Sequence, residues 1–372
     1  MTLPPMASIP ARIAAVADYE AEARERMGGA AWAYLSGGAA DELTLADNSA
    51  AFARLKLQGR VLRPLDGGDT RVTLFGDTFD YPVLLAPVAL QTLAHRDGEL
   101  ATVLGASAMR AGMVVSTESG IALEEIARAA QTSLWFQLYL QPDRDFTAAL
   151  VARAEAAGCR ALVLTVDAPV NGVRNREQRA GFALPPGVEA ANLRGMPPPA
   201  AHRAGAPGGS PLFGSGLLAH APTWDDVAWL RSITRLPVVL KGVLAAADAE
   251  AAVDAGIAGL IVSNHGGRTL DTLPATIDAL PAVAAAVAGR IPVLLDGGVR
   301  RGSDVLKALA LGADAVLVGR PYVYALAAAG APGVAHVLHL LRAELEVAMA
   351  LTGCRTLADI GPEVLWSAVR QP

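Results

Sequence analysis

The chain has 372 residues and a net charge of −5, with 52% hydrophobic residues and only 18% charged ones. No basic patch runs along it, which argues against nucleic acid as a partner. Asp, Glu or Gly interrupts apolar stretches such as 244–262, so we expect no membrane-spanning helix, which needs about 20 apolar residues. Two cysteines are too few for a disulfide framework. The N-terminus lacks the plan of a signal peptide, so we expect a cytoplasmic protein.

Residues 1–82 are predicted to form an N-terminal segment ahead of the main fold. Helical patterns occur at 10–26 and 41–53, with Asp41 as the expected N-cap of the second helix. Between them, the paired glycines Gly37-Gly38 stop helical structure and free the backbone. Residues 70–81 predict a hairpin that turns at Gly76-Asp77.

From residue 83 onward, short apolar runs alternate with helical stretches. The runs are continuous in hydrophobicity, as expected for parallel strands that are buried on both faces. Eight strand-then-helix units predict an α/β fold, a (β/α)8 TIM barrel at 83–330, followed by a C-terminal helical segment at 331–372 in the same domain. The predicted strands are 83–87, 112–116, 134–139, 161–166, 237–241, 258–263, 291–296 and 314–319, and the predicted helices include 98–110, 122–130, 144–157, 247–255, 277–288 and 302–311.

One connection is much longer than the others. Residues 181–222, between the fourth and fifth predicted strands, are rich in Pro, Gly and Ala. A long segment at a strand-to-helix connection overhangs the catalytic face of such a barrel and can act as a lid. The alternative is an insertion without a role in catalysis.

Polar and ionisable residues concentrate at the carboxyl ends of the predicted strands, where barrels of this kind place their active sites. Fold stability alone does not require that concentration. In strand order, these residues are Pro87 and Ala89; Ser116; Gln137 and Tyr139; Thr165, Asp167 and, just beyond, Arg174; Lys241; Ser263, His265 and Arg268; Asp296, Gly298 and Arg300; Gly319 and Arg320.

The loops after the last two strands predict a phosphate site. Gly297, Gly298 and Gly319 allow backbone N–H groups to approach a ligand closely, and Arg300 and Arg320 add positive charge. Two ordinary tight turns are the alternative, because glycine is common wherever the backbone is left-handed.

His265 is the candidate general base. It follows a buried strand and has Arg268 three residues on, while Asp167 at another strand end could fix its tautomer and stabilise the imidazolium. Such a set suits removal of a proton or hydride from a carboxylate-bearing substrate. A structural histidine is the alternative. Lys241 has three interpretations: a Schiff-base lysine, an anion stabiliser or a member of a structural ion pair.

Metal binding has little support. Only His336 and His339 are close among the six histidines, and no carboxylate or cysteine completes a ligand set. We therefore expect no metal site.

Taken together, these motifs resemble the FMN-dependent (S)-2-hydroxy-acid oxidases and dehydrogenases, which include glycolate oxidase, lactate oxidase and mandelate dehydrogenase. The strongest match is 263–271 (SNHGGRTLD), which is close to the active-site signature of the family. The resemblance covers about residues 15–360. Further matches are 296–302 (DGGVRRG), 136–139 (FQLY), 164–167 (LTVD), 241–242 (KG) and 319–321 (GRP).

The resemblance implies FMN as cofactor and a role for each motif residue. His265 would take a proton from the substrate hydroxyl or Cα, helped by Asp167; whether a hydride or a carbanion leaves stays open. Tyr34, Arg174 and Arg268 would hold the substrate carboxylate and Tyr139 its hydroxyl. The flavin ring and ribityl chain would contact Pro87, Ala89, Ser116, Gln137, Thr165, Lys241 and Ser263, and the ribityl and phosphate end would contact Asp296, Gly298, Arg300, Gly319 and Arg320.

The sequence departs from the family pattern near the expected substrate pocket. Tyr34 is followed by Leu35, where the family often has two adjacent tyrosines. Glu118 stands where many relatives are expected to have a neutral residue, and it either alters the choice of substrate or points to water. The stretch 169–174 (PVNGVR) is more similar to lactate oxidase than to glycolate oxidase.

These features favour an oxidase that converts an (S)-2-hydroxy acid to the 2-oxo acid and reduces O2 to H2O2, with lactate or glycolate as the first choice of substrate. A mandelate-type aromatic substrate, or a dehydrogenase with another electron acceptor, is the alternative. A flavin-using isomerase and a non-enzymatic FMN-binding module are disfavoured by the carboxylate-binding residues and by the His265, Asp167 and Arg268 set. The resemblance also implies a homotetramer or octamer.

Overall fold

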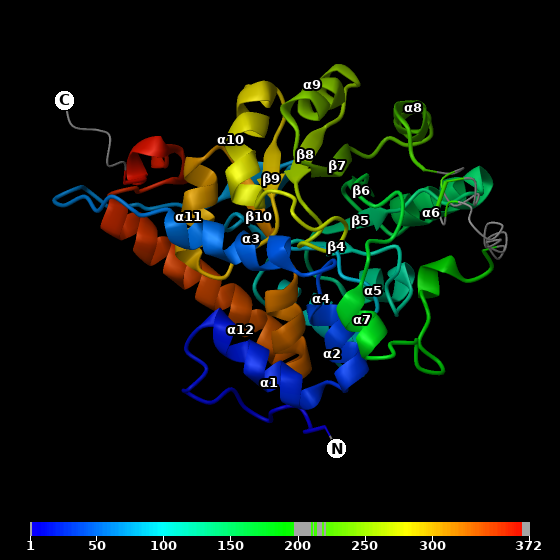
Figure 1. The fold of residues 1–372 in the computed structure, drawn as a ribbon. Helices are drawn as coiled ribbons and strands as arrows, with labels where there is room; N and C mark the ends of the chain where they lie inside the picture. Colours follow the sequence, from blue (N-terminus) through cyan, green and yellow to red (C-terminus); the bar gives the residue numbers. More distant parts are fainter. Residues whose placement is uncertain (1, 197–209, 211, 214–217, 219–220, 367–372) are drawn as a thin grey trace.

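The computed structural model describes residues 2–196, 210, 212–213, 218 and 221–366. Eight parallel strands close into a barrel in the order β10-β3-β4-β5-β6-β7-β8-β9, which confirms the predicted (β/α)8 barrel (Figure 1). Each observed strand overlaps its predicted range. The barrel strands are β3 (Val83–Leu85), β4 (Met113–Val115), β5 (Leu134–Leu138), β6 (Leu162–Thr165), β7 (Val238–Val243), β8 (Gly259–Val262), β9 (Val293–Leu295) and β10 (Ala315–Val318).

Helices follow the strands and form the outer layer of the barrel (Figure 1). Six of them match the predicted helices closely, because each carries a buried apolar face. Two more, α7 (Asn175–Arg179) and α8 (Trp224–Ser232), flank the long connection and were not predicted. The six matching helices are α4 (Gly98–Ala108), α5 (Leu123–Ala129), α6 (Arg144–Ala156), α9 (Ala246–Asp254), α10 (Thr276–Val287) and α11 (Gly302–Ala310).

Apolar side chains fill the inside of the barrel, and a hairpin closes its amino-terminal end. The hairpin consists of β1 (Val72–Leu74) and β2 (Asp77–Phe79), and its Phe75 ring lies 5.2 Å from the ring of the fully buried Trp135. The turn lies at Phe75-Gly76, one residue before the predicted position, because Leu74 pairs with Asp77. Both turn residues have positive φ, 51° and 89°, as a two-residue hairpin turn of the primed type requires.

The N-terminal segment forms shorter helices than predicted. The predicted helix 10–26 begins only at Val16, as a 3-10 turn that leads into α1 (Tyr19–Arg26). It begins there because the Asp18 carboxylate accepts the N–H groups of Ala14 and Ala15, at 2.9 and 2.8 Å. The next helix, α2 (Gly29–Ser36), was not predicted, but it ends at Gly37 where the paired glycines stop helical structure.

Helix α3 (Leu43–Arg54) corresponds to the predicted helix 41–53, but the prediction that Asp41 caps it is wrong. The backbone N–H groups of Asp41 and Thr44 both donate to the carboxylate of Asp271, at 3.1 and 2.8 Å. Asp271 lies 230 positions further along the chain, in the loop after β8. The cap of α3 therefore also ties this helix to the barrel.

The last helix, α12 (Arg320–Thr352), is long and apolar enough by composition to span a membrane, so the expectation that no such stretch exists is wrong. No Asp, Glu, Lys or Arg lies between Arg320 and Arg342. However, 67% of its most apolar window is buried inside the protein, where the helix packs against α4, α1 and α11 (Figure 1). It kinks at Ala329 and Gly330, at the predicted border between barrel and C-terminal segment. Such burial is typical of a helix in the core of a protein.

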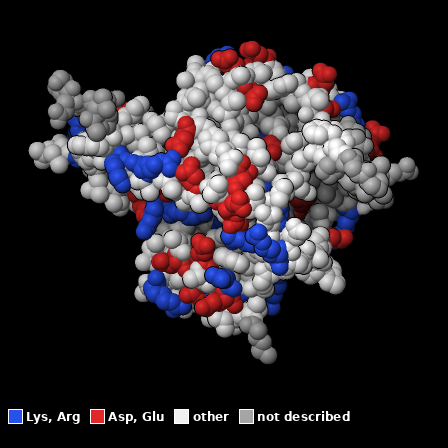
Figure 2. Space-filling model, in the orientation of Figure 1, with Lys and Arg blue, Asp and Glu red and all other residues white. Residues whose placement is uncertain are grey.

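Charged side chains of both signs are interspersed on the face shown in Figure 2. On this face they do not gather into a broad basic surface, in agreement with the net charge of −5.

Candidate active site

A cavity of about 970 Å³ opens at the carboxyl ends of the barrel strands, which is the size of a typical ligand site. Described residues of the long connection, such as Phe182 and Leu212, also line it, as expected for a segment over the catalytic face. The rest of that predicted lid, including 197–209, lies outside the described residues. The predicted site residues that line the cavity are Tyr34, Pro87, Ala89, Ser116, Gln137, Tyr139, Thr165, Arg174, Lys241, His265, Arg268, Asp296, Gly298, Arg300, Gly319 and Arg320.

Two predicted residues, Asp167 and Ser263, lie behind the cavity wall and contact residues that line it. The Asp167 Oδ1 is 2.9 Å from Nδ1 of His265. The Ser263 hydroxyl accepts a hydrogen bond from the Lys241 ammonium at 2.8 Å. Both residues therefore position a charged or titratable neighbour.

The Asp167 contact decides which nitrogen of His265 can act as a base. A carboxylate at Nδ1 keeps the proton on that nitrogen, so Nε2 carries the free lone pair. Nε2 lies 3.4 Å from the hydroxyl of Tyr139, which lines the cavity. Burial lowers the pKa of His265 below its ordinary value, although Asp167 acts in the opposite direction. The imidazole is thus held neutral and oriented, as a general base requires.

The backbone around His265 is left-handed and closely packed. His265 has φ 58°, and Gly266 and Gly267 follow with 63° and 72°. A Cβ at Gly267 would stand 2.7 Å from the backbone nitrogen of Leu45 in α3. A left-handed histidine is strained, and the two glycines make room for the turn that holds it.

Lys241 forms a buried ion pair at the floor of the cavity. Its ammonium lies 3.0 Å from Oδ2 of Asp296, with both side chains less than 10% exposed. Burial acts to lower the pKa of Lys241, but the charges of Asp296 and Asp167 outweigh it and raise the pKa. Gly242, with φ 112°, lets the backbone of β7 approach, because a Cβ there would lie 2.5 Å from the Asp167 Cβ. Lys241 is therefore a fixed cation, which fits an anion stabiliser and not a neutral Schiff-base amine.

A row of polar side chains crosses the floor from β4 to β6. The Gln137 Oε1 accepts a hydrogen bond from Ser116 Oγ at 3.2 Å, and its Nε2 donates to Thr165 Oγ1 at 3.1 Å. All three side chains are buried. Buried amides and hydroxyls arranged in this way offer donors and acceptors of defined direction to a planar heterocycle.

Arg174 and Arg268 meet at one carboxylate, that of Glu177. The Glu177 Oε1 lies 3.0 Å from Arg174 Nη1 and 3.2 Å from Arg268 Nη2. Arg268 also donates to the backbone carbonyls of Tyr34 and Gly37, each at 2.7 Å, and stands over the Tyr34 ring. The three predicted carboxylate-binding residues are thus brought together. Two adjacent guanidinium groups can bind a further carboxylate.

The loops after β9 and β10 also reach the cavity. Gly298, Arg300, Gly319 and Arg320 line it, and burial lowers the pKa of both arginines, that of Arg320 to about 9. Arg320 donates to the carbonyls of Ser36, Gly37 and Gly266, which ties the end of α2 to the His265 loop. Arg320 therefore holds these two segments together, a role that the sequence did not reveal. Its predicted role is to bind the phosphate.

Sequence reasoning missed Glu177 and the pair formed by Asn48 and Asn264. The spacing of three residues from Arg174 was the available signal for Glu177. The two asparagines exchange side-chain hydrogen bonds of 2.9 and 2.8 Å, which fastens α3 beside His265. Nothing in the sequence pairs residues so far apart.

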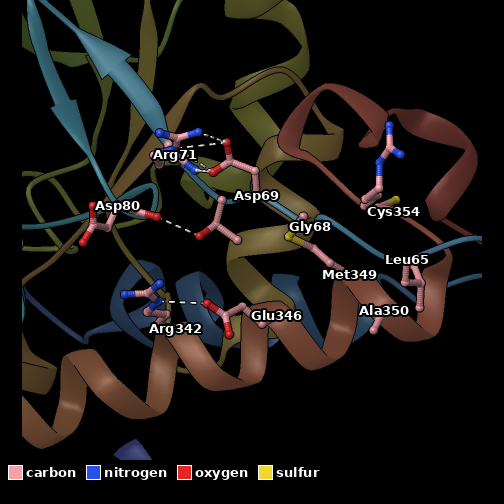
Figure 3. A pocket seen from close by; sticks show the side chains of 12 residues that line it. Leu65, Gly68, Asp69, Arg71, Asp80, Arg342, Glu346, Met349, Ala350 and Cys354 are labelled. Atoms are coloured by element: carbon pink, nitrogen blue, oxygen red, sulfur yellow. Dashed lines mark hydrogen bonds and ion pairs between the residues drawn. The ribbon is translucent and has the colours of Figure 1, made fainter.

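A second cavity, of about 460 Å³, lies between residues 65–71, which lead into the hairpin, and the second half of α12 (Figure 3). Most of its charges are paired with one another, Arg71 with Asp69 at 2.7 Å and Arg342 with Glu346 at 2.8 Å. None of the predicted site residues is among its lining residues. We therefore place the chemistry in the larger cavity.

Within the described residues, no group of three His, Cys, Asp or Glu side chains could hold a metal ion. The Nδ1 of His336 is 2.8 Å from the hydroxyl of Tyr19, and its ring packs edge-on against that tyrosine. This histidine thus has a structural contact, as its place on an apolar helix suggested.

Comparison with known proteins decides the family. Residues 23–367 match the family model of the FMN-dependent dehydrogenases. The chain belongs to this family. An L-lactate oxidase from Alicycliphilus denitrificans is 50% identical over 361 residues, 97% of this chain and 98% of its own. Glycolate oxidase 1 from Oryza sativa subsp. japonica is 45% identical over 345 residues, 93% of each chain. A structure of mandelate oxidase with (S)-2-phenylpropionate superposes with a TM-score of 0.85 at 44% identity, over 95% of this chain and 98% of that one.

The residues of the cavity fit the FMN of this family. The Oδ1 of Asp296 is buried and has no hydrogen-bond partner among the described residues, so it can accept a ribityl hydroxyl. Gln137 and its neighbours offer polar atoms to the flavin ring, and Lys241 offers a fixed positive charge. Arg300 and Arg320, with the glycine loops between β9 and α12, form the cationic end that a phosphate requires.

Proposed function

We propose that this FMN-dependent dehydrogenase oxidises an (S)-2-hydroxy acid to the 2-oxo acid and passes the electrons to O2, which gives H2O2. The proposal is supported by relatives that are named L-lactate oxidase and glycolate oxidase and by a mandelate oxidase of the same fold. The observation that carries it is the assembly in one cavity of an oriented base, His265, and two arginines that can hold a carboxylate. A 2-hydroxy acid offers each of these groups its partner.

The residues have complementary tasks. Arg174 and Arg268 bind the substrate carboxylate, and Tyr139 donates to the substrate hydroxyl, which places the reacting carbon beside His265. Nε2 of His265 removes a proton from the substrate while Asp167 stabilises the imidazolium that forms. FMN, when bound, would supply the acceptor for the two electrons and the second hydrogen of the substrate, and O2 would take them up as H2O2. Lys241 provides a fixed positive charge that would stabilise the negative charge of the reduced flavin.

A short aliphatic acid, lactate or glycolate, is the substrate class that we propose. The stretch 169–174 and the 50% identity to an L-lactate oxidase support lactate. A mandelate-type acid is the second candidate, favoured by the apolar side chains of Phe182, Leu184 and Leu212 along the cavity.

The test is oxygen consumption with a panel of (S)-2-hydroxy acids, together with measurement of H2O2. We expect one equivalent of H2O2 for each 2-oxo acid formed, with short acids such as lactate or glycolate giving a higher kcat/KM than mandelate. Flavin reduction by a hydroxy acid with negligible O2 consumption would instead assign a dehydrogenase with another acceptor. Failure of every hydroxy acid to reduce the bound flavin would contradict the proposal.

A further inference from the structure

Glu118 is an acidic residue in the wall of the substrate cavity. It lies in the connection between β4 and α5, two residues after Ser116. Its backbone is held from both sides, because its N–H donates to Ser116 Oγ at 3.1 Å and its carbonyl accepts from Leu90 N–H at 3.0 Å. The side chain is partly buried and borders the cavity, so it does not simply point to bulk water.

The Glu118 carboxylate has no hydrogen-bond or ion-pair partner among the described residues. It nevertheless interacts electrostatically with four groups of the substrate site, Arg174, Arg268, Tyr34 and Tyr139. Burial raises its pKa, and the charges of Arg174 and Arg268 act in the opposite direction. Burial is the largest cause of the raised pKa of Tyr34 and of Tyr139, and the negative charge of Glu118 is the second. A partly buried carboxylate without a protein partner has lost part of its hydration without compensation. A hydrogen-bond donor that the protein does not supply can therefore bind there favourably.

The charges around the cavity indicate what that group is. Arg174 and Arg268 bring two positive charges, and Glu177 and Glu118 bring two negative ones. The substrate carboxylate adds a third negative charge to this half-buried set, where like charges repel more strongly than in water. A hydrogen-bond donor or a cation on the remaining part of the substrate would both balance that charge and give Glu118 its partner. A second carboxylate on the substrate would add to the repulsion.

We propose that Glu118 selects 2-hydroxy acids whose side chain carries a hydrogen-bond donor, an ammonium or hydroxyl group, next to the reacting carbon. This inference rests on the proposed function and narrows its substrate class. Lactate and glycolate have no hydrogen-bond donor on the side chain, so this proposal ranks them below donor-bearing acids of similar size.

Four compounds with one three-carbon skeleton test the proposal. (S)-Lactate has a methyl group, (S)-glycerate a hydroxymethyl group and (S)-isoserine an aminomethyl group, and tartronate has a second carboxylate. We expect kcat/KM of the FMN-loaded enzyme to be highest for isoserine and glycerate, intermediate for lactate and lowest for tartronate. A kcat/KM for lactate about tenfold above both donor-bearing acids would overturn the proposal. This ranking needs no variant.

Glu118→Gln then tests the carboxylate itself, with almost unchanged size. We expect the ratio of kcat/KM for isoserine to that for lactate to fall about tenfold, the loss of one charge-assisted hydrogen bond. The ratio for tartronate to lactate should rise. An unchanged pair of ratios in Glu118→Gln would refute the assignment.

Glu125→Gln is the matched control, because Glu125 is exposed on α5, just after the same connection. It should leave both ratios at the wild-type values. Turnover of lactate without a preference for the donor-bearing acids would contradict only the proposal for Glu118. Failure of all four acids and of mandelate to reduce the flavin would overturn the proposed function as well.

Discussion

At the scale of residues, the site depends on carboxylates that bind and orient the side chains with chemical roles, His265 and Lys241. Asp167 fixes the tautomer of His265, and Asp296 keeps Lys241 charged at the floor of the cavity. In both pairs one carboxylate oxygen, Asp167 Oδ2 and Asp296 Oδ1, has no partner among the described residues. Such atoms are costly when buried, and that of Asp296, which lines the cavity, is available to a group that arrives with the cofactor.

The pKa of His265 predicts the acid side of the pH profile. The base must be neutral, and burial holds its pKa below the ordinary value of about 6.5. Activity should therefore persist as the pH falls through 6.5 and decline only below it, where the imidazole becomes protonated. The measurement is kcat/KM against pH.

Asp167→Asn is the corresponding variant. It removes the charge that raises the pKa of His265, so the acid limb should move to still lower pH while the rate falls about 100-fold or more. An acid limb above pH 7, or a shift to higher pH in the variant, would count against the assignment of His265 as base.

At the scale of elements, the loop after β8 organises the N-terminal segment as well as the chemistry. Asp271 caps α3, Asn264 bonds to Asn48 in α3, and Arg268 bonds to the end of α2. Tyr34, on α2, reaches the cavity for this reason. The segment before the barrel is therefore part of the active site.

The cap of α3 gives a prediction for stability. Asp271→Ala leaves the N–H groups of Asp41 and Thr44 without their acceptor, so we expect a loss of about 1–2 kcal/mol in the free energy of unfolding. Asp278→Ala, which breaks an exposed pair with Arg54, is the control and should cost clearly less. Equal stability of Asp271→Ala and wild type in urea unfolding would disprove the cap.

Sequence patterns predicted the elements whose signals are local. Strands such as Leu162–Thr165 are buried on both faces and read as continuous apolar runs, and their polar last residues marked the cavity. The late start of the first helix depends on the nearby Asp18, but other errors occurred where a distant residue decides. Asp271 sets the start of α3, Glu177 joins Arg174 to Arg268 only in the folded chain, and Phe75 of the hairpin turn packs against the distant Trp135.

At the scale of the whole molecule, apolar side chains remain outside the barrel layers. Val61 and Leu62 are 82% and 100% exposed, and they lie near Leu351 of α12, which is 66% exposed. The backbone N–H of Arg60 donates to the Leu351 carbonyl at 3.0 Å, so both segments form one surface. An exposed apolar surface of this kind is typical of a subunit contact.

We therefore predict an oligomer, a tetramer or an octamer as the family resemblance implies. Light scattering should give a mass four or eight times that of one chain, and Leu62→Asp with Leu351→Asp should lower it. A wild-type monomer at micromolar concentration would contradict this prediction.

The central claim is that His265 removes the proton during oxidation of a 2-hydroxy acid. The most direct test is anaerobic mixing of the FMN-loaded protein with (S)-lactate, (S)-glycerate and (S)-mandelate while the flavin absorbance is followed. At least one acid should bleach the wild-type flavin fully within a single turnover, and His265→Asn should retain FMN but bleach about 1,000-fold more slowly or not at all. Bleaching of the His265→Asn flavin at the wild-type rate would contradict the account.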